Sequence, residues 1–158
     1  MIATPHMLVG AILGDLIDNL PWAFLAGLAS HFIFDAIPHL EPANFGKHEK
    51  NGSYELSTNQ MVFEFFEVAV GAALIIYLFF KFGNPSIITG AVGAILPDVI
   101  DNVPFWGPAL RKLPGFKQFH QFHQLVHCSL EGKSWIFGLP IYIIVIGIAI
   151  WYFGFLRS

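Results

Sequence analysis

The sequence has one cysteine and few charged residues, and both shortages narrow the class of protein. A single cysteine, Cys128, excludes an intrachain disulfide and a zinc site built only from cysteines. Charged residues are 12% of the 158 residues, about half the share of a soluble domain. The formal net charge is -3 and no basic patch is present. Nothing therefore indicates a nucleic-acid partner.

Several common motifs are also missing. The first ten residues contain no lysine or arginine, so we expect no secretory signal. The chain has no serine nucleophile elbow and no glycine-rich loop of the phosphate-binding type. Serine-hydrolase and nucleotide-binding chemistry therefore receive no support.

Apolar residues, in contrast, are abundant. They make up 55% of the chain, and the mean hydropathy is +0.62. Residues Trp135–Leu156 carry no charge, and a helix of that length is about 33 Å long, enough to cross a hydrocarbon core of roughly 30 Å. Met61–Phe82 is as long, although Glu64 and Glu67 lie in its first turns. Both segments are predicted to span a bilayer.

The pattern predicts one all-α domain over residues 1–158, a polytopic membrane bundle of about five membrane segments plus one amphipathic, histidine-rich helix. We expect the membrane segments at residues 4–19, 22–37, 61–82, 86–102 and 135–156, and the amphipathic helix at 116–130. Thr4 is the expected N-cap of the first helix. The first two segments are short for a full span, which favours tilted or re-entrant helices.

Lysine and arginine predict the orientation. If the segments alternate in direction, one side receives Lys47, Lys50, Arg111, Lys112, Lys117 and Lys133, and the other receives only Lys81 and Arg157. The basic side should be cytoplasmic. The chain is therefore predicted to be a multi-pass protein of the cell inner membrane with a cytoplasmic N-terminus.

The same topology sends metal-binding side chains from separate segments to the cytoplasmic leaflet. They are His6, His31, Asp35, His39, Asp98, Asp101, His120, His123 and His127, with Glu64 and Glu67 nearby. Several of them share a helix face, because they are spaced by three or four residues. Only Asp15 and Asp18 fall toward the opposite side.

Imidazole and carboxylate without thiolate form the ligand set of zinc, manganese or iron sites. The donors exceed the need of one tetrahedral ion, so two or three ions would use them better. A competing interpretation treats these residues as helix caps, as a pH-sensitive interfacial face and, for Glu64 and Glu67, as a solvated helix start. Ionisable groups in lipid cost about 2.5 kcal/mol or more each, however, and rarely persist without a task. The combination therefore favours a divalent metal site, with zinc the first candidate.

Four segments carry a resemblance to small bacterial inner-membrane proteins known as membrane-bound metal-dependent hydrolases. The chain matches their opening helix with "TPHMLVGA" and their Leu-Pro-Asp motif with Gly93, Ala94, Leu96, Pro97 and Asp98, while Asp101 stands one place later than the family's second aspartate. Its His31 and Asp35 match a His-x-x-x-Asp helix that comes later in the family, and His123, His127 and Ser129 loosely match a His-rich motif whose Arg-Gly is missing here. The phrase "HFIFDAIPH" is also faintly similar to a helix of zinc-dependent phospholipases C.

This resemblance implies a metal-dependent hydrolase that uses metal-activated water. The predicted position of the site at the level of the lipid headgroups suggests a small-molecule or lipid-like substrate such as a phosphodiester. The nine His and Asp residues named above as reaching the cytoplasmic leaflet are then the candidate ligands, and the candidate catalytic groups are His123, His127 and Asp101.

Two other functions remain open. The phrases "GAILGDLIDNLPW" (10–22) and "GAILPDVIDNVPF" (93–105) are identical at nine of thirteen positions, and the alternating topology makes them inverted relative to one another. Inverted repeats are typical of secondary transporters, so a small transporter or channel for divalent cations or protons is one alternative. A noncatalytic membrane scaffold is the other.

Overall fold

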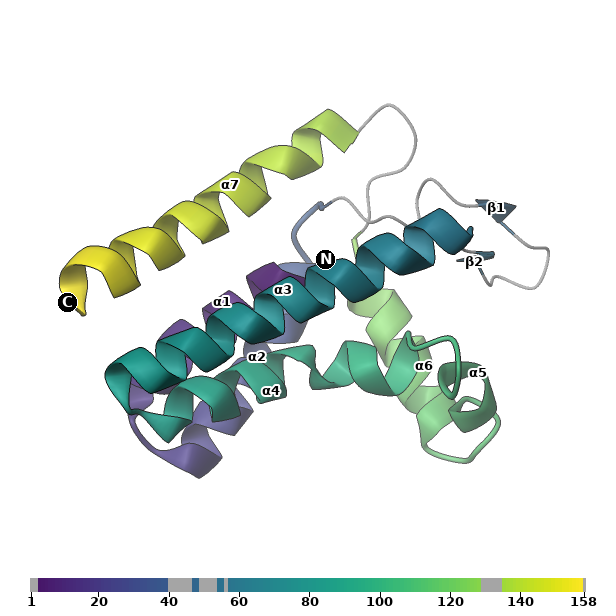
Figure 1. The fold of residues 1–158 in the computed structure, drawn as a ribbon. Coiled ribbons are helices and arrows are strands. Elements are labelled where there is room, and N and C mark those ends of the chain that lie inside the picture. The colour runs from purple at the N-terminus through teal and green to yellow at the C-terminus, as the bar shows by residue number, and fades with distance from the viewer. Residues whose placement is uncertain (1–2, 40–46, 49–53, 56, 129–134, 158) are drawn as a thin grey trace.

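The computed structural model describes residues 3–39, 47–48, 54–55, 57–128 and 135–157, and this part of the chain is almost entirely helical (Figure 1). The helices are α1 (Ala3–Ile17), α2 (Leu20–Asp35), α3 (Thr58–Phe82), α4 (Pro85–Asp101), α5 (Gly107–Leu110), α6 (Phe116–Val126) and α7 (Trp135–Trp151), the last continued by the π-helical turn η3 (Tyr152–Leu156). The two-residue strands β1 (Lys47–His48) and β2 (Tyr54–Glu55) pair antiparallel. The predicted all-α class is confirmed.

Most helix ends follow local capping chemistry. The side chain of Asn19 accepts a hydrogen bond from the backbone N–H of Trp22 at the start of α2. Ser57 and Gln60 form a reciprocal capping box at the start of α3, and Gly83 ends that helix with φ 67°. The expected segments therefore agree with the helices within a few residues, although α6 ends at Val126 rather than at residue 130.

The start of α1 differs from the expectation. Thr4 lies inside the helix, so its prediction as the N-cap was wrong. The carboxylate of Glu67 on α3 instead accepts the backbone N–H groups of Ala3 at 3.0 Å and Thr4 at 2.6 Å. A negative group at this position also complements the helix dipole. Glu67 therefore caps a neighbouring helix.

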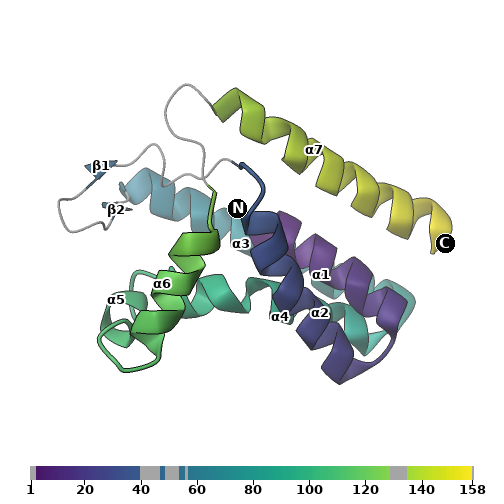
Figure 2. The same cartoon turned by 180° about the vertical axis from the view of Figure 1, so that it is seen from behind.

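Small residues bring α1 and α2 onto α4 (Figure 2). A Cβ atom added to Gly10 or to Gly27 would lie 2.3 or 2.1 Å from the carbonyl oxygen of Gly90, so the backbones meet without intervening side chains. Gly10 lies opposite Gly90 and Gly14 lies opposite Ser86, so α1 and α4 are antiparallel. The two copies of the repeated phrase are therefore inverted in space, as the alternating topology predicts.

The antiparallel arrangement of α1 and α4 places the pair Asp15 and Asp18 far from the pair Asp98 and Asp101. The C-terminal ends of α2 and α4 meet the N-terminal end of α1 at one end of the bundle, which we call the site end. Asp15, near the other end of α1, accepts hydrogen bonds from Asn84 at 2.9 Å, from Tyr152 at 2.8 Å and from Arg157 at 2.8 Å. Asp15 therefore ties the C-terminal turn of the chain to the far end of the bundle.

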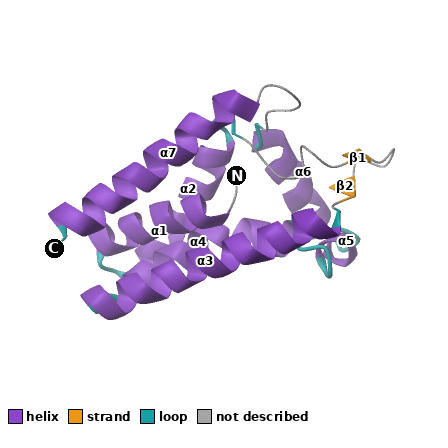
Figure 3. Cartoon of the chain, turned by 45° about the horizontal axis from the view of Figure 1, so that its top comes forward, coloured by secondary structure: helices purple, strands orange, loops and turns teal. Residues whose placement is uncertain are grey.

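Two of the described helices are long and apolar enough to cross a membrane, Thr58–Phe82 with 25 residues and Gly138–Leu156 with 19. They lie on either side of α1 (Figure 3). Both carry large apolar side chains on the outside, such as Phe66 at 67% and Ile143 at 70% exposure. The helices α1 and α2 are apolar but shorter, so a bundle of about five membrane segments stays a prediction.

Some residues used above lie outside the described part of the chain. They are Lys50 and Lys133 of the orientation argument and Ser129 of the resemblance.

Candidate metal centre

The predicted ligands converge on the site end from four parts of the fold. His6 comes from α1, His31 and Asp35 from α2 with His39 just after it, Asp98 and Asp101 from α4, and His120 and His123 from α6 with His127 just after it. Five of these side chains are at most 1% exposed: His6, His31, Asp35, His39 and His123. Sequence spacing thus identified a set of residues that the fold brings together.

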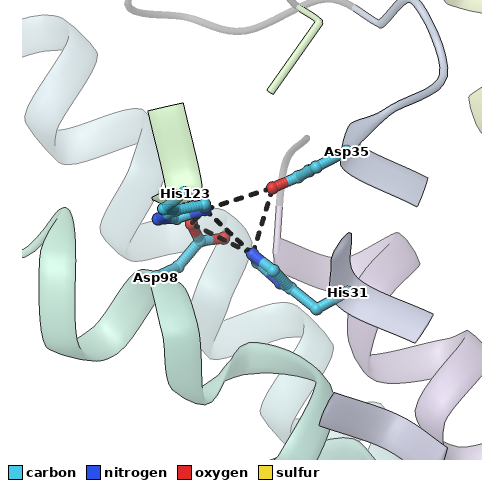
Figure 4. Close-up of side chains that lie close together, drawn as sticks. All are labelled: His31, Asp35, Asp98 and His123. Carbon is cyan, nitrogen blue, oxygen red and sulfur yellow. Dashed lines mark hydrogen bonds and ion pairs between the residues drawn. The ribbon is translucent and has the colours of Figure 1, made fainter. Parts of the chain in front are cut away.

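Four of them turn ligand atoms toward one point (Figure 4). His31, Asp35, Asp98 and His123 each offer one atom, and these atoms all lie within 4.8 Å of one another. The Nε2 atoms of His31 and His123 are 3.1 Å apart. Asp35 Oδ2 lies 3.0 Å from Nε2 of His31 and 3.2 Å from Nε2 of His123. Asp98 Oδ1 lies 3.8 Å and 3.7 Å from the same two atoms. Two imidazoles on one tetrahedral zinc place their nitrogens about 3.3 Å apart.

The hydrogen bonds behind these rings fix their tautomers. His31 Nδ1 lies 2.8 Å from the carbonyl oxygen of Ala94. A carbonyl oxygen only accepts, so Nδ1 carries the hydrogen. His123 Nδ1 lies 3.0 Å from the carboxylate of Asp101 and donates in the same way. In the neutral form of each ring, the lone pair on Nε2 then points toward the other ring. This arrangement is usual for histidines that bind metals.

Convergent lone pairs repel one another unless a positive charge lies between them. The carboxylate of Asp35 faces the same point and adds a negative charge. Burial works to lower the pKa of His123, but the hydrogen bonds to Asp101 and Asp35 outweigh it, so the pKa is raised to about 9. The pocket therefore attracts a cation, whether a proton or a metal ion, and these buried His and Asp groups could hold a metal.

A second group of possible ligands shares Asp35. Asp35, His39 and His127 also offer ligand atoms within 4.8 Å of one another. Backbone hydrogen bonds from Cys128 to the Asp35 carbonyl at 2.8 Å, and from His39 to the Cys128 carbonyl at 3.1 Å, join the ends of α2 and α6. His39 Nδ1 donates to the carbonyl of Ile37 at 2.8 Å.

Asp101 and His120 lie behind these groups. The carboxylate of Asp101 accepts hydrogen bonds from His120 Nδ1 at 2.8 Å, from His123 Nδ1 at 3.0 Å and from Arg111 Nε at 2.8 Å. Neither Asp101 nor His120 belongs to a group of converging ligand atoms. Arg111 is a residue that the sequence analysis missed as part of the site, because one arginine in a loop has no spacing pattern.

His6 joins the site from the other side. Its Nε2 lies 3.1 Å from Asp35 Oδ1, and its ring stacks on His31 with centroids 4.3 Å apart.

Phe32 on α2 contacts two rings of α6. Its ring meets that of Phe122 edge-on with centroids 5.1 Å apart and that of His123 with centroids 5.9 Å apart. These contacts pack α6 against α2.

No protein family, curated protein or solved structure matches the chain.

Proposed function

We propose that this chain is a membrane-embedded, metal-dependent hydrolase. The observation that carries the proposal is the convergence of the His31 and His123 Nε2 atoms, 3.1 Å apart, on the carboxylate of Asp35. Both rings have their Nδ1 hydrogens committed elsewhere. A buried cluster of this kind is costly unless a cation satisfies it.

The donor set supports a divalent transition metal. Two imidazole nitrogens and two carboxylates suit zinc first, and also manganese or iron. His31, Asp35, Asp98 and His123 would hold the ion, while Asp101 and Ala94 orient the two rings from behind. A divalent ion held there would polarise a phosphoryl oxygen and lower the pKa of a bound water toward neutrality.

The edge of the site offers an approach for a substrate. The side chain of Asp98 is 19% exposed, whereas those of Asp35, His31 and His123 are fully buried. Arg111 and His120 are 28% and 29% exposed beside Asp101. The guanidinium group at this edge favours an anionic substrate, such as a phosphodiester.

The surrounding surface supports a location in a bilayer. Besides the two long apolar helices, α6 exposes Phe122 at 49% and Leu125 at 83%. We propose that α1, α2 and α4 also lie within the membrane, and that α6 rests on its cytoplasmic face, in the inner membrane. The site then lies at the headgroup level, where a lipid-like phosphodiester can reach it.

The inverted copies of the repeated phrase favour a second candidate, a transporter of divalent cations or protons. A transporter would use both acidic pairs. Asp15, however, is held by Asn84, Tyr152 and Arg157 at the end of α1 away from the metal ligands. A structural role accounts for these contacts, so hydrolysis is the better-supported function.

Elemental analysis of the protein purified in detergent, combined with cleavage of bis(p-nitrophenyl) phosphate and of a lipid phosphodiester, tests the proposal. We expect bound metal and metal-dependent cleavage in the wild type, and loss of both in Asp98→Ala and His31→Ala. The exposed Asp18, at the far end, provides a matched control: Asp18→Asn should retain both.

Other results would contradict hydrolysis. The transporter would be established if the wild type carries ions into liposomes and cleaves no phosphodiester. Asp15→Asn and Asp98→Ala should then reduce the ion flux equally. If the wild-type protein binds no zinc, manganese or iron, the noncatalytic membrane scaffold is the remaining interpretation.

A further inference from the structure

We propose that Asp35 bridges two metal ions, and that the second ion is held by Asp35 with His39 and His127, the second group of converging ligand atoms. This inference rests on the proposed metal site and adds a second ion to it. It assigns His127 to metal binding, one of the two roles that the sequence predicts for this residue.

The two oxygens of Asp35 face different histidines. Oδ2 lies 3.0 Å from His31 Nε2 and 3.2 Å from His123 Nε2. Oδ1 lies 3.1 Å from His6 Nε2 and 3.9 Å from His39 Nε2. One carboxylate thus stands between two sets of imidazole nitrogens, which is the arrangement of a bridging ligand.

The second set is buried and oriented. The side chains of His39 and His127 are 0% and 8% exposed. His39 donates Nδ1–H to the carbonyl of Ile37, so in the neutral ring the lone pair on Nε2 points toward Asp35. A cation placed between this lone pair and the carboxylate of Asp35 is attracted by both groups.

His127 completes the second set. Its Nε2 lies 3.8 Å from Asp35 Oδ2, and its ring lies against that of His39 with centroids 4.6 Å apart. The backbone hydrogen bonds through Cys128 hold both histidines beside the end of α2. The position of His127 therefore depends on the backbone, since the residue lies just beyond α6.

The charge of the pocket changes with the second ion. Asp35 and Asp98 together neutralise one divalent ion, so a single ion leaves a neutral site. A second ion makes the site cationic, and ions bridged in this way lie about 3.5–4 Å apart in hydrolases that act on phosphate esters. The two-ion site therefore selects an anionic phosphate ester over a neutral ester or amide.

Manganese provides the test, because it is paramagnetic and suits the same ligands. The chelator-treated, full-length wild type is titrated with Mn²⁺ and followed by electron paramagnetic resonance and elemental analysis. We expect two ions per chain and an exchange-coupled spectrum. His39→Gln should bind one ion with an uncoupled spectrum, and Asp35→Asn should lose the coupling and most of the metal.

The controls separate this inference from the proposed function. Asp18→Asn should retain two coupled ions. If the wild type binds one ion and still cleaves phosphodiesters, the second ion is ruled out but the proposed hydrolase function is not. If His39→Gln retains two coupled ions, the assignment of the ligands is wrong. If the wild type binds two coupled ions and cleaves no phosphodiester, only the hydrolase function is ruled out. The wild-type titration needs no variant, so a variant that fails to fold does not prevent a decision.

Discussion

His123 on α6 donates its Nδ1 hydrogen to Asp101 on α4, across 3.0 Å. The same carboxylate accepts hydrogen bonds from His120 and Arg111. Because Asp101 fixes the orientation of the ring, the Nε2 atom of His123 is aimed at His31 and Asp35. A carboxylate behind a metal-binding histidine also makes that histidine a stronger ligand.

Asp101→Asn should weaken metal binding by about 10- to 100-fold, because the substitution removes the charge behind His123 but keeps the size of the side chain. Competition with a chromogenic chelator measures the affinity. His120→Gln is the control, since it removes another partner of Asp101 while leaving His123 in place, and its effect should be smaller. Equal affinity in Asp101→Asn and the wild type would show that Asp101 does not orient a ligand.

Removal of the metal should destabilise the protein. An ion present at 100 times its dissociation constant stabilises the folded state by about 2.7 kcal/mol. The thermal midpoint in detergent should therefore fall when a chelator is added to the wild type. In Asp35→Asn, which lacks the carboxylate shared by both groups of ligands, the chelator should have a much smaller effect. An equal fall in both proteins would mean that the stabilising ion binds elsewhere.

Gly90→Ala should disturb the site from a distance. A Cβ atom at Gly90 would lie 2.1 Å from the carbonyl oxygen of Gly10, so α1 must move away from α4. We expect a loss of about 1–3 kcal/mol in the free energy of unfolding, together with weaker metal binding, because His6 is on α1. Urea unfolding in detergent and elemental analysis measure the two effects.

Gly147→Ala is the matched control for this substitution, because nothing lies within 4 Å of the added methyl group. It should be neutral or slightly stabilising, since alanine is the better helix former. A similar loss of stability in both variants would show that the contact between α1 and α4 is not the cause.

Tyr152→Phe should separate stability from metal binding. It removes the hydroxyl that donates to Asp15 at 2.8 Å, which should cost about 1–3 kcal/mol. The metal content should stay unchanged, because Asp15 lies at the far end of α1. Loss of metal in this variant would connect the two ends of the bundle and support the transporter.

The helices and the membership of the site were predictable because both depend on local spacing. Capping residues mark helix ends, and His31 and Asp35 lie four residues apart on one helix face. The separate roles of Asp98 and Asp101 were not predictable, because their spacing puts both on one face of α4. Which of them faces the pocket depends on where α6 docks.

Glu67 illustrates a second limit. In the sequence it resembles a solvated residue in the first turns of a helix. Its function as the cap of α1 arises from the packing of α3 beside that helix. Contacts between segments so far apart leave no pattern in one sequence, so only three-dimensional structure reveals them.

The distance along the chain between His31 and His123, 92 positions, has a consequence for biosynthesis. During translation, α1 to α4 emerge and can pack before α6 exists. A nascent chain at that stage offers only part of the ligand set. For the proposed metal site, we therefore expect loading with metal to be a late step of maturation.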